Sequence, residues 1–253
     1  MNPALRLVEK EMYVYFKTYY TELTYVILFP FLLIWTMEYG IGKDYDIEIS
    51  GELIRYMHFI APGIIIMSVV TTAFFNTGFI MLFEKEYQGS FEGVITCPIS
   101  AGEVVFGKIL SGTIKSVLNG MIIIVILLIV MEYSPPWQLV LSPLILFVAG
   151  LFFSAVGIML GVVLKRGYQL GTIGNLVVFP PTFIGGIFFD VNMLPSGVAT
   201  AVKLSPVTMM IDGLRKLMVF GDANIAVELI VCLLTSMLLY LLATKVFERQ
   251  VII

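Results

Sequence analysis

The sequence predicts an all-α integral membrane protein with six transmembrane helices. Of its 253 residues, 59% are hydrophobic and only 13% are charged, whereas a soluble domain has about 45–50% apolar and about 25% charged residues. The mean hydropathy is +0.98. Uncharged stretches of about 20 residues, long enough to cross a bilayer as a helix, recur along the chain. The roughly ten-residue alternating segments of a transmembrane β-barrel are absent, so helices are the expected way to satisfy the backbone hydrogen bonds.

Residues 3–20 are predicted to form an interfacial helix on the inner leaflet. Apolar residues of this segment fall near one helical face and charged residues mostly fall on the other: the first set is Leu5, Val8, Met12 and Tyr19, and the second is Arg6, Glu9, Lys10 and Lys17. Interleaved aromatic and cationic residues are typical of helices that lie in the membrane interface. A simple cytoplasmic extension of the first span is the alternative.

Within one domain over residues 1–253, six stretches are predicted to span the membrane: about 23–41, 59–83, 109–131, 139–164, 170–189 and 225–243. Lysine and arginine accumulate on the cytoplasmic side of membrane proteins. If the N-terminus lies inside, ten of the 15 lysines and arginines fall on the inner side and five on the outer side. The predicted topology therefore places both termini in the cytoplasm, in a multi-pass protein of the plasma or inner membrane.

The loop of residues 84–109, between the second and third spans, is too long and too charged for a simple turn. Ser100-Ala101-Gly102-Glu103 matches a capping box, in which the serine oxygen and the glutamate satisfy first-turn amides. We therefore expect a helix that begins there and continues into the third span. Residues 90–96 are compatible with a short helix parallel to the membrane, whose apolar side chains, Phe91 among them, would dock on another surface.

Small residues recur at helical spacing in the fourth and fifth spans. A helix face made of small residues lets two helix backbones approach closely in lipid, where the hydrophobic effect does not drive helices together. They are therefore predicted to mark tight packing, within one subunit or across a dimer: Gly150, Ser154, Gly157 and Gly161 in the fourth span, and Gly167, Gly171 and Gly174 in the fifth.

The fifth span ends in Phe179-Pro180-Pro181, and an apolar but broken stretch follows at 187–219. This stretch contains Pro195 and Pro206, so one straight helix cannot hold it. We expect a helix that breaks near the outer leaflet, followed by short re-entrant helices whose irregular backbone is buried by protein. A plain external loop is the alternative.

The sequence lacks the residue patterns of ATP hydrolysis and of metal binding. No G-x-x-x-x-G-K-[ST] phosphate loop occurs. His58 is the only histidine, and no carboxylate or cysteine cluster accompanies it to complete a metal site. The chain is therefore predicted to bind no cofactor of its own and to have no catalytic or metal site, and no nucleic-acid partner is expected.

The polar residues placed deep in the predicted spans are neutral. Ionisable residues at span centres usually mark proton relays or ion-coupled transport. Here the ionisable residues of the spans are assigned to span ends: Glu38, Lys115, Glu132 and Glu228. The asparagines at depth either hold helices together by hydrogen bonds, which is the favoured interpretation, or line a substrate path. The candidates for such a path, with two aromatic residues added, are Asn76, Asn119, Asn175, Phe179 and Phe188.

Two ordered blocks of residues resemble the membrane subunits of ABC type-2 transporters, the exporter permeases that include lipo-oligosaccharide, polysaccharide and drug exporters. The first block is Glu84-Lys85-Glu86, Gly89-Ser90, Pro98-Ile99-Ser100 and Gly107-Lys108. The second is Pro180, Gly185-Gly186-Ile187-Phe188-Phe189, Leu194-Pro195, Pro206-Val207-Thr208 and Asp212-Gly213-Leu214-Arg215. The chain departs from the family pattern at Ser90, where threonine is usual, and at Asp190, where many members have proline.

The resemblance implies that two copies of the chain pair and sit on two separately encoded ATP-binding subunits, which would bind ATP and magnesium. Residues 90–96 would be a cytoplasmic coupling helix that inserts in a groove of the ATPase, with Phe91 as the inserting side chain. Closure of the ATPase on ATP would then move a hydrophobic or amphipathic substrate outward. The coupling residues that the resemblance implies are Glu84, Glu86, Gly89, Ser90, Phe91, Glu92 and Pro98.

Two other classes of function stay open at this point. An ion-coupled carrier or channel would be marked by buried carboxylates, inverted repeats or a filter loop. A membrane-embedded lipid-modifying enzyme would need paired carboxylates, histidines or a metal cluster at the interface. The sequence alone shows none of these groupings.

Overall fold

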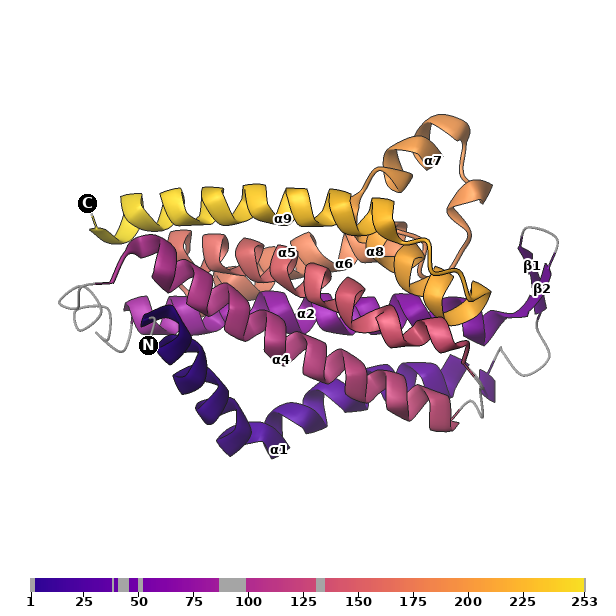
Figure 1. Ribbon diagram of the computed structural model, residues 1–253, viewed down its shortest axis with the longest axis horizontal. Helices are drawn as coiled ribbons and strands as arrows, with labels where there is room; N and C mark the ends of the chain where they lie inside the picture. The colour runs from indigo at the N-terminus through magenta and orange to yellow at the C-terminus, as the bar shows by residue number, and fades with distance from the viewer. Residues whose placement is uncertain are drawn as a thin grey trace.

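The computed structural model describes residues 3–37, 39–40, 46–49, 52–86, 99–130 and 135–252, and most of them are helical. Figure 1 shows an elongated bundle whose main helices lie roughly along its long axis, with the N- and C-termini at the same end. The main helices are α1 (Pro3–Met37), α2 (Tyr56–Glu86), α4 (Ala101–Val130), α5 (Ser142–Val163), α6 (Gly167–Ile184) and α9 (Ala226–Phe247). Short helices η2 (Trp137–Leu141) and η5 (Glu248–Ile252) precede α5 and follow α9.

Within the described ranges, four helical segments are long and apolar enough to cross a membrane: Tyr56–Glu86, Ala101–Val130, Trp137–Val163 and Ala226–Gln250. Leu28–Met37, in the second half of α1, is a shorter apolar helical segment. The chain is therefore an all-α, multi-pass membrane protein. The predicted spans at 23–41 and 170–189 fall on α1 and α6, which are not among the four segments.

Helix α5 packs against α2, α4 and α9, with its most extensive contact to α2. A Cβ atom added at Gly157 would collide with the carbonyl oxygen of Phe74 on α2, and one at Gly161 would lie 2.5 Å from the carbonyl oxygen of Gly78. A Cβ atom at Gly150 would lie 2.7 Å from the Oγ of Ser116 on α4. The absence of side chains at these positions lets α5 approach both neighbours closely.

A helix was predicted to begin at the capping box and to continue toward the third span. Its start is confirmed, because α4 begins at Ala101, directly after Ser100. The backbone N–H of Ser100 donates to the Glu103 carboxylate at 2.9 Å, and the backbone N–H of Glu103 donates to the Ser100 Oγ at 3.3 Å. This reciprocal pairing is the capping box that the four residues predict.

Helix α1 is one bent element rather than two separate helices. In Figure 1 its first arm runs outward from the N-terminus, and its second arm returns toward the far end of α4. In the first arm, Ala4, Glu11 and Tyr15 are at most 5% exposed, whereas Leu5 is 50% exposed. The face that packs on the bundle therefore differs from the apolar face that the sequence suggested, and it carries a carboxylate.

The loop between α1 and α2 contains a β-hairpin that the sequence analysis did not anticipate. Strands β1 (Asp46–Ile49) and β2 (Glu52–Arg55) pair antiparallel, with Ile47 opposite Ile54. The hairpin lies at the end of the bundle away from the termini (Figure 1). Each strand has only four residues, two of them charged and two apolar, which is too short for a clear alternating pattern.

Short helices connect α6 to α9: η3 (Val191–Met193), α7 (Ser196–Lys203), α8 (Pro206–Arg215) and η4 (Lys216–Phe220). The chain turns at Gly186 and again at Gly221, where φ is +90° and +59°, values that glycine adopts without steric penalty. Helix α8 packs against α2, α5 and α9, whereas α7 projects from the bundle (Figure 1). The stretch after α6 is thus a set of short helices and not an unstructured loop.

Candidate functional site

A cavity of about 1200 Å³ lies between α1, α2 and α6, and Lys115 of α4 also contributes to its wall. On α2 its lining extends from Ile64 to Glu84, which is about 30 Å along a helix. Pockets for drug-sized ligands typically enclose about 300–1,000 Å³. The cavity is therefore long and large enough for an extended molecule.

Aromatic side chains form much of the apolar wall of this cavity. Phe75, Phe79 and Phe83 follow each other at one-turn spacing on α2, with consecutive ring centres 5.9 Å apart and interplanar angles of 22° and 21°. Phe29 of α1 and Phe179 of α6 also line the cavity. Such a wall suits the hydrocarbon or aromatic part of a ligand.

Charged side chains gather at the end of the cavity that is nearest the termini. Glu11 of α1 is 5% exposed, and each of its carboxylate oxygens accepts a hydrogen bond from a lysine of α4. Lys108 donates to Oε1 at 3.0 Å and Lys115 donates to Oε2 at 3.3 Å. Glu84 of α2 pairs with Lys108 at 2.5 Å and with Lys10 at 3.8 Å. This network of five charged residues, which we name the charge cluster, ties α1 to α2 and α4.

Lys115, which was assigned to a span end from the sequence, is buried inside the bundle. Lys115 lies in the middle of the 30-residue α4 and is 2% exposed. Its ammonium group also donates to the Asn76 Oδ1 at 3.3 Å and lies 5.8 Å from the ring centre of Tyr15. Hydropathy along the chain could not show that Glu11, 104 residues earlier, supplies the opposite charge.

Three of the five candidate substrate-path residues line the cavity: Asn76, Asn175 and Phe179. Asn119 is buried outside the lining, and its Oδ1 accepts a hydrogen bond from the Tyr15 hydroxyl at 2.7 Å. Phe188 also lies outside the lining. Its ring stacks on Phe183 with centres 5.4 Å apart, so it belongs to the packing of the segment after α6.

The three glycines of α6 differ in their surroundings. A Cβ atom added at Gly174 would lie 2.5 Å from the ring of Phe74 on α2, so this glycine allows a close contact. A Cβ atom added at Gly171 would have no heavy atom within 4 Å, and one at Gly167 would lie 3.8 Å from the ring of Phe79. Gly171 is part of the cavity wall. Neither of these two glycines marks a tight contact within the described part of this subunit.

Of the predicted coupling residues, the structure describes Glu84 and Glu86, at the end of α2. Glu86 pairs with Lys85 at 3.2 Å, and Lys85 also donates to the backbone oxygen of Val162 at 2.7 Å, near the end of α5. Glu84 belongs to the charge cluster. The remaining coupling residues, Gly89, Ser90, Phe91, Glu92 and Pro98, lie outside the described residues.

Outside the charge cluster, the buried Arg215 holds the short helices against the bundle at the end away from the termini. Its guanidinium donates to the backbone oxygens of Gly186 at 2.7 Å and Phe59 at 3.3 Å and to Asp212 at 2.8 Å, and it lies 3.9 Å from the centre of the Phe59 ring. Burial raises the pKa of the Asp212 carboxyl above its ordinary value, although the nearby guanidinium acts in the opposite direction. Arg215 thus joins α8, α2 and the turn after α6.

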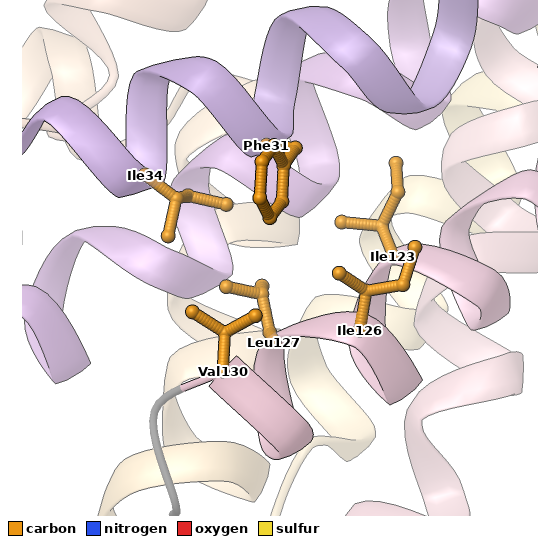
Figure 2. A pocket seen from close by; sticks show the side chains of 6 residues that line it. All are labelled: Phe31, Ile34, Ile123, Ile126, Leu127 and Val130. Carbon is orange, nitrogen blue, oxygen red and sulfur yellow. The ribbon is translucent and has the colours of Figure 1, made fainter. Parts of the chain in front are cut away.

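Figure 2 shows a second, much smaller pocket between the second arm of α1 and the end of α4. Phe31 and Ile34 of α1 face Ile123, Ile126, Leu127 and Val130 of α4, and the enclosed volume is about 10 Å³. A space of this size holds about one water-sized probe, and its lining offers a water no polar partner. It is a packing defect and not a ligand site.

A multi-pass helical bundle with a long, partly charged cavity is typical of membrane transport proteins. The chain belongs to the ABC-2 type transporter family, whose model matches residues 5–219. This confirms the resemblance based on the two sequence blocks.

Individual relatives are similar over large parts of the chain. The inner membrane transport permease YadH of Escherichia coli strain K12 is 29% identical over 161 residues, which cover 63% of this chain and 62% of YadH, less than two thirds of that relative. Nodulation protein J of Rhizobium leguminosarum biovar trifolii is 25% identical over 182 residues, 71% and 69% of the two chains. Nodulation protein J of Bradyrhizobium diazoefficiens is 24% identical over 218 residues, 85% and 82% of the two chains.

Proposed function

We propose that this chain is the transmembrane subunit of an ATP-driven exporter that moves a hydrophobic or amphipathic substrate outward. The observation that carries the proposal is the cavity of about 1200 Å³, with its wall of phenylalanines, in a chain of the ABC-2 type family. Energy for transport would come from a separate ATPase subunit, which would bind ATP and magnesium. Two copies of the chain would pair and stand on two such subunits.

The arrangement of helices supports a link between the ATPase and the cavity. The last turn of α2 and the start of α4 lie at the same end of the bundle as both termini (Figure 1). Glu84 and Lys108 bridge these two helices on either side of the predicted coupling loop, and Lys108 also contacts Glu11 of α1. A movement of the loop would therefore reach α1, which forms one wall of the cavity.

The proposed membrane topology has six spans, with α1 and α6 crossing beside the four apolar helices and with both termini in the cytoplasm. Residues 3–20 would lie at the inner interface, and α7 and α8 would be re-entrant from the outer side. Exposed Lys165 and Arg166 between α5 and α6 lie at the terminal end of the bundle, as the positive-inside rule would require.

The structure also raises an ion-coupled carrier as a second candidate, because Glu11 is a buried carboxylate of the kind that marks proton relays. However, both of its oxygens already pair with ammonium groups, which stabilise the ionised form and oppose proton uptake. The exporter therefore remains the better supported function.

Co-purification tests the proposed function without knowledge of the substrate. The tagged chain is isolated from its native membrane in neutral detergent, and ATP hydrolysis and bound proteins are measured. We expect a stoichiometric ATP-binding subunit that is lost in Phe91→Asp. Tyr168→Asp is the matched control, because Tyr168 is an exposed aromatic residue at the start of α6, at the same end of the bundle. If both variants retain the ATP-binding subunit equally, the coupling role of Phe91 is contradicted. If the chain purifies without an ATPase, the ion-coupled carrier is favoured.

A further inference from the structure

We infer that α7 is a membrane anchor at the water–lipid boundary, with its apolar face in the bilayer and its polar face turned toward water. The partner of this surface is the phospholipid of the leaflet at the end away from the termini, which is the outer leaflet in the proposed topology. Three features support the inference: how little protein covers α7, the two faces of the helix, and its position on the α9 side of the bundle.

Helices α7 and α8 are neighbours in the chain but differ in how much protein covers them. Residues along most of α8 are buried, including Met210, Ile211 and Leu214. In α7 Ala199 alone is buried, and its main contacts are with η3 and α8. Val198 is 50% exposed. Within the proposed re-entrant segment, α8 is therefore packed on protein, whereas the described part of the subunit leaves most of α7 uncovered.

The surface of α7 is divided into an apolar and a polar face. Residues at i, i+3 and i+4 share one side of a helix, and residues at i, i+4 and i+7 likewise share a side. The apolar set is Val198, Ala201 and Val202, and the polar set is Ser196, Thr200 and Lys203. A short helix with this division and a cation on its polar face is suited to the membrane interface.

The polar face of α7 already has a protein partner. The Lys203 ammonium group donates to the side-chain oxygen of Asn192 in η3, and Asn192 in turn donates to the Asp190 carboxylate at 2.8 Å. The only cation of α7 is thus engaged within the chain. The contact with the bilayer therefore rests on the apolar face and needs no particular headgroup.

The position of α7 indicates that lipid covers this apolar face. Figure 1 shows α7 projecting from the bundle on the same side as α9, level with the start of α9 along the long axis. Helix α9 lies in a segment able to span the membrane, and only 17% of its apolar window is buried. Its exposed residues are large, such as Ile230, Leu234 and Met237, whereas close helix contacts in membranes use small residues. This side of α9 therefore faces lipid, and α7 projects where that lipid meets water.

The test measures how lipid and water reach a label on α7. The two cysteines of the chain, Cys97 and Cys232, are replaced by serine and alanine, and the full chain is reconstituted into phosphatidylcholine nanodiscs. Val198→Cys or Thr200→Cys then carries one nitrobenzoxadiazole label, on the apolar or the polar face. One quencher is phosphatidylcholine with a nitroxide near the headgroup end of its acyl chain, and the other is iodide in the water.

The lipid nitroxide should remove most of the fluorescence at Val198→Cys and iodide little of it, with the reverse order at Thr200→Cys. The physical reason is that an interfacial helix buries its apolar face about 5–10 Å into the boundary between headgroups and acyl chains. Leu234→Cys on the exposed face of α9 is the lipid reference, and Ala223→Cys in the exposed turn before α9 is the water reference. Ala201→Cys repeats the measurement on the apolar face, in case one label disturbs the helix.

Three results would overturn the inference. If iodide reaches Val198→Cys and Ala201→Cys as readily as Ala223→Cys, α7 belongs to a water-exposed loop. If neither quencher reaches these two positions, protein such as a second copy covers the face. If the lipid nitroxide quenches Thr200→Cys as strongly as Val198→Cys, α7 is immersed in hydrocarbon and does not lie at the boundary. The nanodiscs contain no ATP and no ATPase, so the outcome is independent of the co-purification that tests the exporter.

Discussion

Glu11 is a buried carboxylate that links α1 to α4. It lies in the first arm of α1 and receives one hydrogen bond from each of two buried lysines on α4. A buried charge that loses its partner is strongly destabilising, because the remaining ion is neither hydrated nor paired. Glu11 therefore stabilises Lys115 inside the bundle, shares Lys108 with Glu84, and holds α1 at the cavity wall.

Replacing Glu11 by glutamine should lower the free energy of unfolding by about 3–5 kcal/mol, because the buried Lys115 would lose its carboxylate partner and Lys108 would keep only Glu84. Thermal unfolding in detergent, followed by fluorescence-detected size exclusion, measures the change. Glu9→Gln is the control, since Glu9 is exposed two residues earlier. Equal melting of the two variants would show that the charge cluster does not hold α1 in place.

Arg215 is expected to be intolerant even of lysine. The guanidinium contacts two backbone oxygens, the Asp212 carboxylate and the face of Phe59 at once, and a lysine ammonium has neither the planar fork nor the reach to make all four contacts. Arg215→Lys should lower stability by about 1–3 kcal/mol through an unsatisfied buried acceptor. Lys203→Arg, on exposed α7, should leave the melting temperature unchanged. Wild-type stability in Arg215→Lys would contradict the role of Arg215 in holding α8, α2 and the turn after α6 together.

At the scale of elements, close contact between α5 and α2 depends on two glycines. Gly157→Ala introduces a Cβ that collides with the Phe74 carbonyl, so the two helices must move apart, at a cost of about 1–3 kcal/mol. Gly171→Ala has open space around the added carbon and should leave stability unchanged or slightly increased. Thermal unfolding of the two variants side by side tests this difference. A Gly157→Ala variant as stable as Gly171→Ala would show that the helices adjust without strain.

The sequence predicted those features that depend on local pattern. The capping box fixed the start of α4, and apolar length identified the four helices that are able to span a membrane. The hairpin at β1 and β2 escaped, because its two strands have only four residues each. For residues 3–20, the face that packs on the bundle differs from the predicted apolar face.

The candidate site was predicted only in part. Asn76, Asn175 and Phe179 were proposed as path residues, and they line the cavity. The pairing of Glu11 with Lys115 was missed because the two residues are 104 positions apart in sequence, and each alone looks like an interfacial charge. One signal was available: Lys115 lies amid an apolar run, and a buried lysine requires a carboxylate nearby.

At the scale of the whole molecule, three helices are linked at one end of the bundle. The two helices that flank the predicted coupling loop meet at the Glu84 and Lys108 pair, Lys108 also contacts Glu11, and Glu11 holds α1 against the cavity. In the proposed exporter, ATP-driven motion would pass through these contacts to the cavity wall.

The composition of the complex tests the central claim most directly. Native mass spectrometry of the tagged chain, released from its own membrane in neutral detergent, gives the mass of the intact assembly and of its subunits. We expect two copies of this chain with two copies of an ATP-binding subunit, and we expect the Phe91→Asp variant to lose that subunit. An assembly that contains this chain alone, under conditions that preserve the fold, would contradict an ATP-driven exporter.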